Sequence, residues 1–401
     1  MNETTVDVCM GKHSSTRSRL AKAISRRIPQ IKAGGLYLSL PDGGVIIRRS
    51  DAIGPEAIIE VNSWIGLLRI LFDGEQGFAD AYLAGEWSTP DLKAVLSWGM
   101  ANERVLARAG SSSLFTRVQN RIRHLRRENT RGGSRRNIAA HYDLGNSFYK
   151  AWLDAEMNYS SAIYAQDDTL ELAQNRKLER VIELLGLEGG ERVIEIGFGW
   201  GALAQRIVSK GCHVTGLTLS REQLAYAHGR MKDARNAADL RIQDYRDVVG
   251  RYDRVASVEM IEAVGERFWP AYFAKISSIL KEGGVAVLQA ITIDEKRFIN
   301  YRKNPDFIQR YIFPGGMLPT GALIKELASA YGLKLVEQEA FGTSYALTLA
   351  EWQHRFFRAW PHIESMGFDQ RFKRMWEYYL AYCEVGFWSG SVDVNLFKFV
   401  R

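Results

Sequence analysis

The stretch VIEIGFGWG, residues 193–201, is an apolar run that ends in three alternating glycines. The sequence WGALAQRIVSKG follows at once, with helical spacing of its apolar residues, and closes on Gly211. Glycine lets the backbone turn sharply and lets a ligand approach without a clash at Cβ. The stretch therefore predicts a strand, a tight turn and a helix, with a ligand site at the turn.

Strand and helix patterns alternate from about residue 137 onward. The predicted strands, seven in all, are 191–199, 212–220, 238–245, 251–260, 283–292, 334–342 and 392–400. Such alternation predicts an α/β fold, a doubly wound, Rossmann-like sheet with ligand sites at the carboxyl ends of its strands. We expect helical lid inserts at about 294–330 and 344–390 to cover the site.

The preceding residues have another organisation. Apolar and polar residues alternate on both sides of Asp42-Gly43-Gly44, which predicts a β-hairpin. Residues 88–91, Ser-Thr-Pro-Asp, predict a helix start. We therefore assign 1–116 to a smaller α+β domain, 117–136 to a linker and 137–401 to the catalytic domain. The linker holds eight arginines and one acid, Glu128.

Composition limits the class of protein. The 401 residues are 46% hydrophobic and 25% charged, which is typical of a globular protein, and they contain no apolar run long enough to span a membrane and no signal-peptide core. Three widely spaced cysteines, Cys9, Cys212 and Cys383, exclude a disulfide framework and a Cys-rich zinc site. We expect a cytoplasmic protein without a metal.

The formal net charge of +7 suggests an acidic partner. The Arg-rich linker is interpreted either as a solvated segment or as a dock on an anionic membrane, where each basic residue contributes roughly 1 kcal/mol. No RRM, KH or zinc-finger signature accompanies it, so we expect no nucleic acid partner.

The glycine spacing and its surroundings distinguish between cofactors. A dinucleotide site uses GxGxxG and an acid at the end of the second strand. Here the spacing is GxGxG, Glu195 lies inside the first strand, and the second strand ends in Thr218-Leu219-Ser220. Asp244-Tyr245 after the third strand offers an acceptor and an aromatic face that suit adenine. This arrangement resembles that of S-adenosylmethionine methyltransferases, whose cofactor has no pyrophosphate. The resemblance implies a seven-stranded sheet whose last strand is antiparallel.

Four further segments are too unusual to be scaffold: AHYDLGNSFYKAWLDAEMNYSSAIY (140–164), SVEMIEAVGERFWPAYF (257–273), FIQRYIFPGGMLPT (307–320) and YYLAYCEVGFWSGSVDV (378–394). Together with the glycine turn they closely resemble the cyclopropane-fatty-acyl-phospholipid synthases and the related mycolic-acid cyclopropane synthases. The resemblance extends from about residue 137 to the C-terminus, and the N-terminal domain resembles more loosely the extra, lipid-associated domain of the bacterial synthases.

The resemblance implies an activity. A methyl group passes from S-adenosylmethionine to the cis double bond of an unsaturated acyl chain in a membrane phospholipid, and proton loss then closes a cyclopropane ring. An alternative is a C-methyltransferase that modifies the same alkene without ring closure. A third reading, a basic nucleic-acid- or membrane-binding module with an inactive core, is disfavoured by the intact glycine turn, Glu262 and Tyr345.

The family's catalytic positions follow from the same resemblance. Glu262 and Tyr345 match residues that hold a bicarbonate ion as general base, Ile291 and Ser161 match positions that contribute backbone groups, and Cys383 matches the cysteine usually given as the active residue. We interpret Cys383 as lining the pocket, because no covalent step is needed. This chain departs from the family in Ser161, where cysteine is common, and in Gln289, where histidine is usual. A glutamine can bind an anion but cannot carry a proton, which leaves ring closure open.

The cofactor positions implied by the family pattern are Tyr159, Ser160, Gly197, Phe198, Gly199, Gly201, Thr218, Leu219, Gln223, Asp244, Tyr245 and Arg246. Without the resemblance, Tyr159 would be interpreted as a core aromatic residue and Gln223 as a solvated residue at a helix start. The expected partners are the phospholipid acyl chain and the anionic inner face of the membrane, with a homodimer left open.

Overall fold

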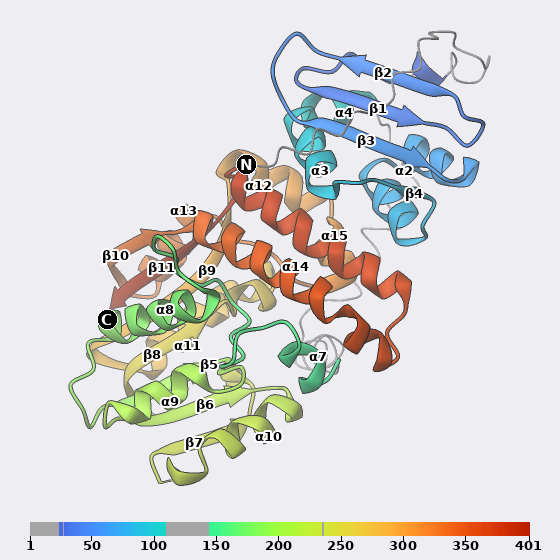
Figure 1. Ribbon diagram of the computed structural model, residues 1–401. Coiled ribbons are helices and arrows are strands. Elements are labelled where there is room, and N and C mark those ends of the chain that lie inside the picture. Colours follow the sequence, from blue (N-terminus) through green and yellow to red (C-terminus); the bar gives the residue numbers. More distant parts are fainter. Residues whose placement is uncertain (1–23, 27, 110–143, 235) are drawn as a thin grey trace. The chain divides into compact units, whose positions relative to one another are not determined.

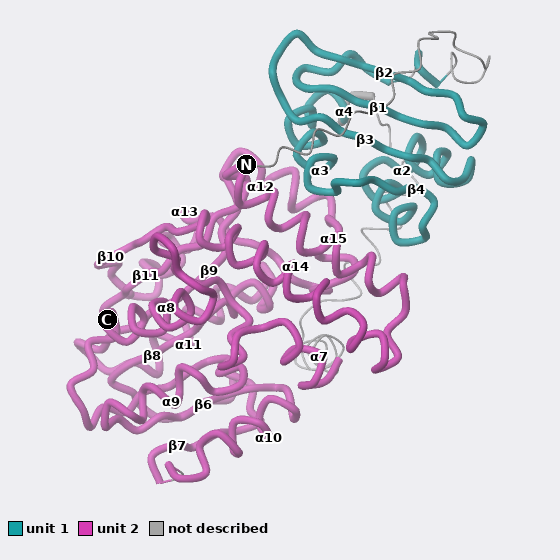
Figure 2. The backbone as a smooth tube through the Cα atoms, viewed as in Figure 1, with its two compact units in different colours: residues 1–111 teal, residues 112–401 magenta. Residues whose placement is uncertain are grey.

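The computed structural model describes residues 24–26, 28–109, 144–234 and 236–401. The chain divides into two compact units, residues 1–111 and 112–401 (Figure 2). The predicted linker, 117–136, lies outside the described residues. Among the described residues no helix is long and apolar enough to cross a membrane.

Unit 1 is a small sheet with helices (Figure 1). Its strands are β1 (Gly35–Ser39), β2 (Val45–Arg49), β3 (Glu56–Val61) and β4 (Trp87–Ser88), and its described helices are α2 (Trp64–Leu83), α3 (Leu92–Ala101) and α4 (Glu103–Ala109). The sheet order is β2-β1-β3-β4. The predicted hairpin is confirmed, since β1 and β2 pair antiparallel and the Gly44 N–H donates to Asp42 Oδ1 at 3.0 Å in the turn.

The predicted helix start near residue 90 is also confirmed. Asp91 is the N-cap of α3, and its side chain accepts a hydrogen bond from the Ala94 N–H at 2.9 Å. This bond satisfies one of the free N–H groups of the first turn. The neighbouring helix α2 is kinked at Gly74, whose φ of 59° and ψ of −139° are not helical.

Unit 2 contains a sheet of seven strands in the order β10-β11-β9-β8-β5-β6-β7. The strands are β5 (Arg192–Ile196), β6 (His213–Thr218), β7 (Ala238–Ile242), β8 (Tyr252–Val258), β9 (Leu280–Ile293), β10 (Lys334–Ala340) and β11 (Val392–Val400). β11 is antiparallel to both of its neighbours, whereas β5 to β9 are mutually parallel. The predicted fold class is therefore confirmed, including the antiparallel last strand.

Helices cover both faces of this sheet (Figure 1). The described helices of unit 2 are α7 (Asn146–Lys150), α8 (Leu170–Leu185), α9 (Ala202–Ser209), α10 (Arg221–Arg230), α11 (Trp269–Ile279), α12 (Glu295–Lys303), α13 (Gly321–Ala330), α14 (Gly342–Ser365) and α15 (Gln370–Trp388). Single turns are η1 (Lys232–Ala234), η2 (Tyr245–Asp247), η3 (Ile261–Ala263), η4 (Glu266–Phe268) and η5 (Ile308–Ile312). On one face α8 packs over β8, β9 and β11 and against α9, and on the other α11 packs on β9 and against α13.

The two predicted inserts differ in how they pack. In the second, α14 and α15 lie side by side and pack against β11. In the first, α13 packs against α11 and β10 and so belongs to the helices that cover the sheet. Of the first predicted insert, α12 and η5 are therefore the parts that do not belong to the helices covering the sheet.

Candidate functional site

The turn after β5 contains three glycines with left-handed backbone, at φ 85° for Gly197, 57° for Gly199 and 88° for Gly201. A Cβ at Gly197 would lie 2.5 Å from Cγ of Met260, and one at Gly201 would lie 3.1 Å from Cβ of Ala227. These two glycines therefore allow close packing inside the protein. A Cβ at Gly199 would meet nothing within 4 Å. Gly199 is thus the glycine of this turn that leaves room for a bound molecule.

Polar groups stand at the ends of the next two strands. At the end of β6 the Thr218 hydroxyl donates to Oε1 of Gln223 at 2.8 Å, and both side chains are buried. After β7 the Asp244 carboxylate accepts two hydrogen bonds from the Arg246 guanidinium, at 2.8 and 2.6 Å. Tyr245 is buried beside this pair, and burial raises the pKa of its hydroxyl to about 12.

These groups meet the requirements of S-adenosylmethionine. Three features lie at three successive strand ends. The glycine turn has open space at Gly199, Thr218 and Gln223 offer oxygen atoms to ribose hydroxyls, and Asp244 is a buried acceptor for an adenine amino group. Ligands of doubly wound sheets bind at the carboxyl ends of strands. The residues present therefore fit the predicted cofactor.

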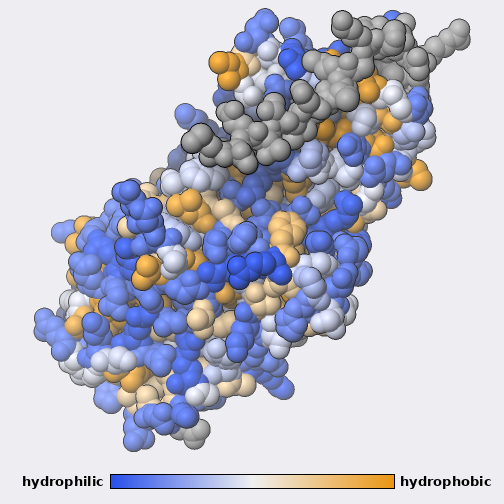
Figure 3. Space-filling model, in the orientation of Figure 1, coloured by the Kyte–Doolittle hydropathy of each residue, from blue (hydrophilic) through white to orange (hydrophobic). Residues whose placement is uncertain are grey.

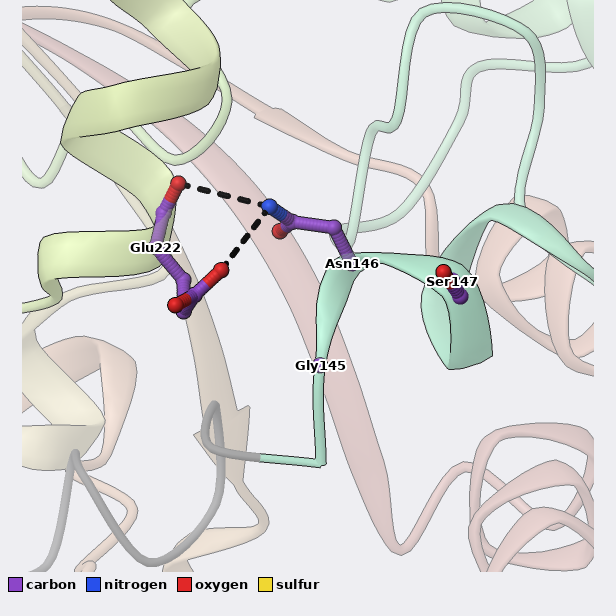
Figure 4. A pocket seen from close by; sticks show the side chains of 4 residues that line it. All are labelled: Gly145, Asn146, Ser147 and Glu222. Carbon is purple, nitrogen blue, oxygen red and sulfur yellow. Dashed lines mark hydrogen bonds between the residues drawn. The ribbon is translucent and has the colours of Figure 1, made fainter. Parts of the chain in front are cut away.

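An open hollow of about 530 Å³ borders this region and is lined by Gly145, Asn146, Ser147 and Glu222 (Figure 4). The Asn146 side chain joins two elements of the cofactor region, because its Nδ2 donates to Oε2 of Glu222 on α10 at 3.2 Å. Its Oδ1 accepts from the indole N–H of Trp200, inside the glycine turn, at 2.7 Å. The hollow therefore adjoins the cofactor residues.

Three hydrogen bonds converge on Glu259, at the carboxyl end of β8. Its carboxylate accepts from the backbone N–H of Ser161, from Nε2 of Gln289 and from the hydroxyl of Tyr345, each at 2.8 Å. Burial raises the pKa of Glu259, and these hydrogen bonds and the charge of Lys177 oppose the rise. Three residues predicted for the catalytic site thus meet on one carboxylate that was not predicted.

Glu262 lies three residues further, in η3. Its Oε1 accepts from the Ile291 N–H at 2.6 Å, and its Oε2 has no hydrogen-bond partner among the described residues. Burial and then the charge of Glu259 raise the pKa of Glu262 to about 8. Two neighbouring carboxyl groups in one site cannot both ionise readily. We therefore assign the proton to Glu262 and the negative charge to Glu259.

A buried lysine, Lys177, lies close to the Glu259 carboxylate. Lys177, on α8, is 1% exposed, and its Nζ donates to the Ser160 hydroxyl at 2.8 Å. Gln174, one turn earlier on the same helix, donates to the Ser160 carbonyl at 2.9 Å. Burial lowers the pKa of Lys177 to about 8, while the charges of Glu259, Asp154 and Glu195 favour its protonated form. The two bonds fix the peptide segment whose next N–H, that of Ser161, reaches Glu259.

Aromatic side chains enclose the same region. The hydroxyls of Tyr159 and Tyr379 are hydrogen-bonded at 2.9 Å, and the ring of Tyr345 lies 4.5 Å from that of Phe387, centroid to centroid. Cys383 lies one helical turn after Tyr379 on α15, and burial raises the pKa of its thiol. A thiol that stays protonated is a poor nucleophile, which agrees with its interpretation as a group lining the pocket.

Met260 links the two halves of the site. It stands between Glu259 and Glu262 in the sequence, and its Cγ is the atom nearest to a Cβ placed at Gly197. The glycine turn therefore packs against the residue that directly follows Glu259. Among the described residues no group of three or more His, Cys, Asp or Glu side chains could hold a metal ion.

Sequence reasoning missed Glu259, Lys177 and Gln174. Glu259 follows a predicted strand directly, where ligand-binding side chains of such sheets stand, and this position was the available signal. Nothing in the sequence distinguishes Lys177 and Gln174 from solvated residues of an amphipathic helix.

The chain matches the family model of mycolic acid cyclopropane synthetase over residues 129–397. It is 41% identical to tuberculostearic acid methyltransferase of Mycobacterium tuberculosis, over 83% of this chain and 80% of that protein. It is 35% identical to cyclopropane-fatty-acyl-phospholipid synthase of Escherichia coli, over 83% and 84% of the two chains. Among solved structures it is similar to a mycolic acid cyclopropane synthase complexed with SAH and CTAB, with a TM-score of 0.63 at 30% identity, covering 67% of this chain and 98% of that one.

Proposed function

The chain belongs to the mycolic acid cyclopropane synthetase family and is an S-adenosylmethionine-dependent methyltransferase of the cyclopropane synthase type, and we propose that it alkylates the cis double bond of an unsaturated fatty acyl chain in a membrane phospholipid. One observation carries the proposal. The glycine turn that fits the cofactor contacts, through Met260, a carboxyl cluster walled by aromatic side chains. Attack by an alkene needs an electrophilic methyl group, cation-tolerant surroundings and a nearby base.

S-adenosylmethionine supplies, when bound, a methyl group on a positively charged sulfur. The turn at Gly199 and the residues Thr218, Gln223 and Asp244 would hold it. The aromatic rings around the carboxyl cluster, among them Tyr159, Tyr345 and Phe387, would tolerate the cationic carbon that forms when the alkene is methylated, because the face of an aromatic ring attracts positive charge. The side chains around the carboxyl cluster would keep water from that carbon.

Two products remain compatible with this site. The first is the cyclopropane fatty acid. The second, favoured by Gln289 in place of the family's histidine and by the 41% identity to a tuberculostearic acid methyltransferase, is an acyl chain that bears the new carbon without a ring. Both share the methyl transfer and differ in how the cation that it forms is converted into a neutral product.

The test uses S-adenosylmethionine with a deuterated methyl group and vesicles of a cis-monounsaturated phospholipid. After saponification the label should be in the fatty acid. A ring or a methylene group keeps two deuterium atoms, whereas a methyl group that survives intact keeps three. Hydrogenation separates the first two, because a methylene group takes up hydrogen under mild conditions that spare a ring. Label confined to the head group, or absent from lipid, would refute the proposal.

We further propose that unit 1 docks on a membrane, the expected source of the substrate. Helix α2 presents Ile65, Leu68 and Phe72 to solvent, 61%, 53% and 53% exposed, at helical spacing. Figure 3 shows hydrophobic side chains standing among hydrophilic ones on the molecular face that it presents. An exposed apolar stripe on a helix suits insertion into a lipid interface. The proposal includes three further points. The membrane surface is the anionic inner face, the protein is cytoplasmic, and the Arg-rich linker contributes to binding.

A further inference from the structure

The residues predicted to hold a bicarbonate ion do not fit one in this chain. A bicarbonate at this place would need the Ser161 N–H, the side chain of residue 289 and the Tyr345 hydroxyl as donors. All three already donate to the carboxylate of Glu259 at 2.8 Å. A free anion would have to take these bonds from Glu259 and stand beside its like charge, which is unfavourable in a site of low dielectric constant.

We infer that the carboxylate of Glu259 takes the place of the free anion and acts as the general base of the reaction. The inference rests on the proposed function. The alkene π electrons form a bond to the transferred methyl carbon, its bond to sulfur breaks, and S-adenosylhomocysteine leaves. Glu259 then removes a proton from the resulting cation. The electrons of that C–H bond close the ring or form a new double bond, and Glu259 becomes a neutral acid.

The charges around Glu259 favour this role. The groups that face it are Lys177 from α8, Glu262 from η3 and Tyr345 from α14, besides the amide groups of Ser161 and Gln289. Lys177 is the cation among them, and Glu262 shares the site in its protonated form. Because burial raises the pKa of Glu259, its carboxylate is a stronger base than an exposed one, and a base works best when its pKa is near the working pH.

The backbone gives independent support. Glu259 has a φ of 48°, in the left-handed region that a residue with a Cβ adopts at a cost of roughly 1–2 kcal/mol. A glycine would adopt it freely. Strain of this kind persists where the surrounding structure fixes it, and it concentrates at functional sites. At this position the strained backbone aims a carboxylate at three donors.

The strain also makes a sharp test possible, since Glu259→Gly should fold well and open the space that the carboxylate fills. Ser161, Gln289 and Tyr345 would then be free to bind an added anion. Glu259→Gln keeps the shape and removes the base. Asp167→Gly is the matched control, because Asp167 also has a left-handed φ, of 60°, and lies exposed outside the site.

The assay measures label from S-adenosylmethionine in saponified fatty acid, in buffer freed of carbon dioxide, with and without added bicarbonate or formate. Wild type and Asp167→Gly should be active and indifferent to the anions. Both Glu259 variants should bind S-adenosylmethionine normally by calorimetry and lose roughly 10²–10⁴-fold in turnover. Anions should restore Glu259→Gly and leave Glu259→Gln unchanged.

Three results would overturn the inference: full activity of Glu259→Gln, a requirement of the wild type for bicarbonate, or a folded, cofactor-binding Glu259→Gly that no anion restores. An inactive wild type would instead contradict the proposed function itself. The two failures are therefore distinguishable.

Discussion

Glu262→Gln should abolish one component of the pH dependence of stability. The pKa of Glu262 is raised from 4.5 to about 8 in the folded protein, first by burial and then by the charge of Glu259. A group whose folded pKa is raised binds its proton more tightly when folded. Its stabilisation is present in full below the unfolded pKa and is lost as the pH rises toward the folded pKa. Wild type should therefore lose stability between about pH 5 and pH 8.

The magnitude follows from the shift. Each pH unit inside this window changes the free energy of unfolding by about 1.4 kcal/mol. From about pH 5 to pH 7.5 the loss from this one group should reach about 3 kcal/mol, an upper value because Glu262 keeps some accessible surface. Glutamine keeps the shape and can still accept from the Ile291 N–H, but it does not titrate. Relative to wild type, Glu262→Gln should gain stability steadily across the window.

The assay is urea denaturation of the full chain at a series of pH values, with the difference between variant and wild type as the readout. Glu195 is also raised to a pKa of about 8 by burial, but it is present in both proteins and cancels in the difference. Glu326→Gln, on the exposed side of α13, is the control for loss of a carboxylate elsewhere. Parallel stability curves for Glu262→Gln and wild type would refute the protonated state assigned to Glu262.

Three further predictions concern the cofactor, the buried cation and the membrane. Gly199→Val should fold with a cost of roughly 1–2 kcal/mol from its left-handed φ and should lose S-adenosylmethionine binding. Gly197→Val should also lose thermal stability, because its side chain would clash with Met260. Unaltered calorimetric affinity in a folded Gly199→Val would remove the cofactor assignment. Lys177→Met removes the cation that helps keep the proposed base ionised. The acid limb of the pH–rate profile should therefore move to higher pH by on the order of one unit. A rate lowered equally at every pH would indicate a structural role alone. Replacing Leu68 or Phe72 by serine should weaken vesicle binding by about tenfold each, judged from the apolar area withdrawn from the lipid, and co-sedimentation unaffected by both changes would exclude α2 as the docking helix.

Much of the fold was predictable because its signals are local. The structure of residues 193–201 could be predicted from the run itself, because an apolar strand and a glycine turn depend on neighbouring residues alone. The hairpin at Asp42-Gly43-Gly44 was predicted for the same reason. The antiparallel direction of the last strand, β11, was expected from the resemblance to methyltransferase sheets. Four residues predicted to be catalytic were also named from sequence, because they lie in unusual segments that resemble a known family: Ser161, Gln289, Ile291 and Tyr345.

The acceptor that these residues serve was decided only by the tertiary structure. The sequence led us to expect a bicarbonate ion as their acceptor, whereas in the structure Ser161, Gln289 and Tyr345 donate to the carboxylate of Glu259. Glu259 reaches these donors from a backbone with a φ of 48°, a conformation that no local propensity of glutamate favours. The same holds for Lys177, which looks like a solvated helix residue until α8 packs on the sheet and removes it from water. Local pattern determined the strands and turns, whereas the position of each charge came from long-range packing, since only packing decides which polar groups lose their water and must find one another.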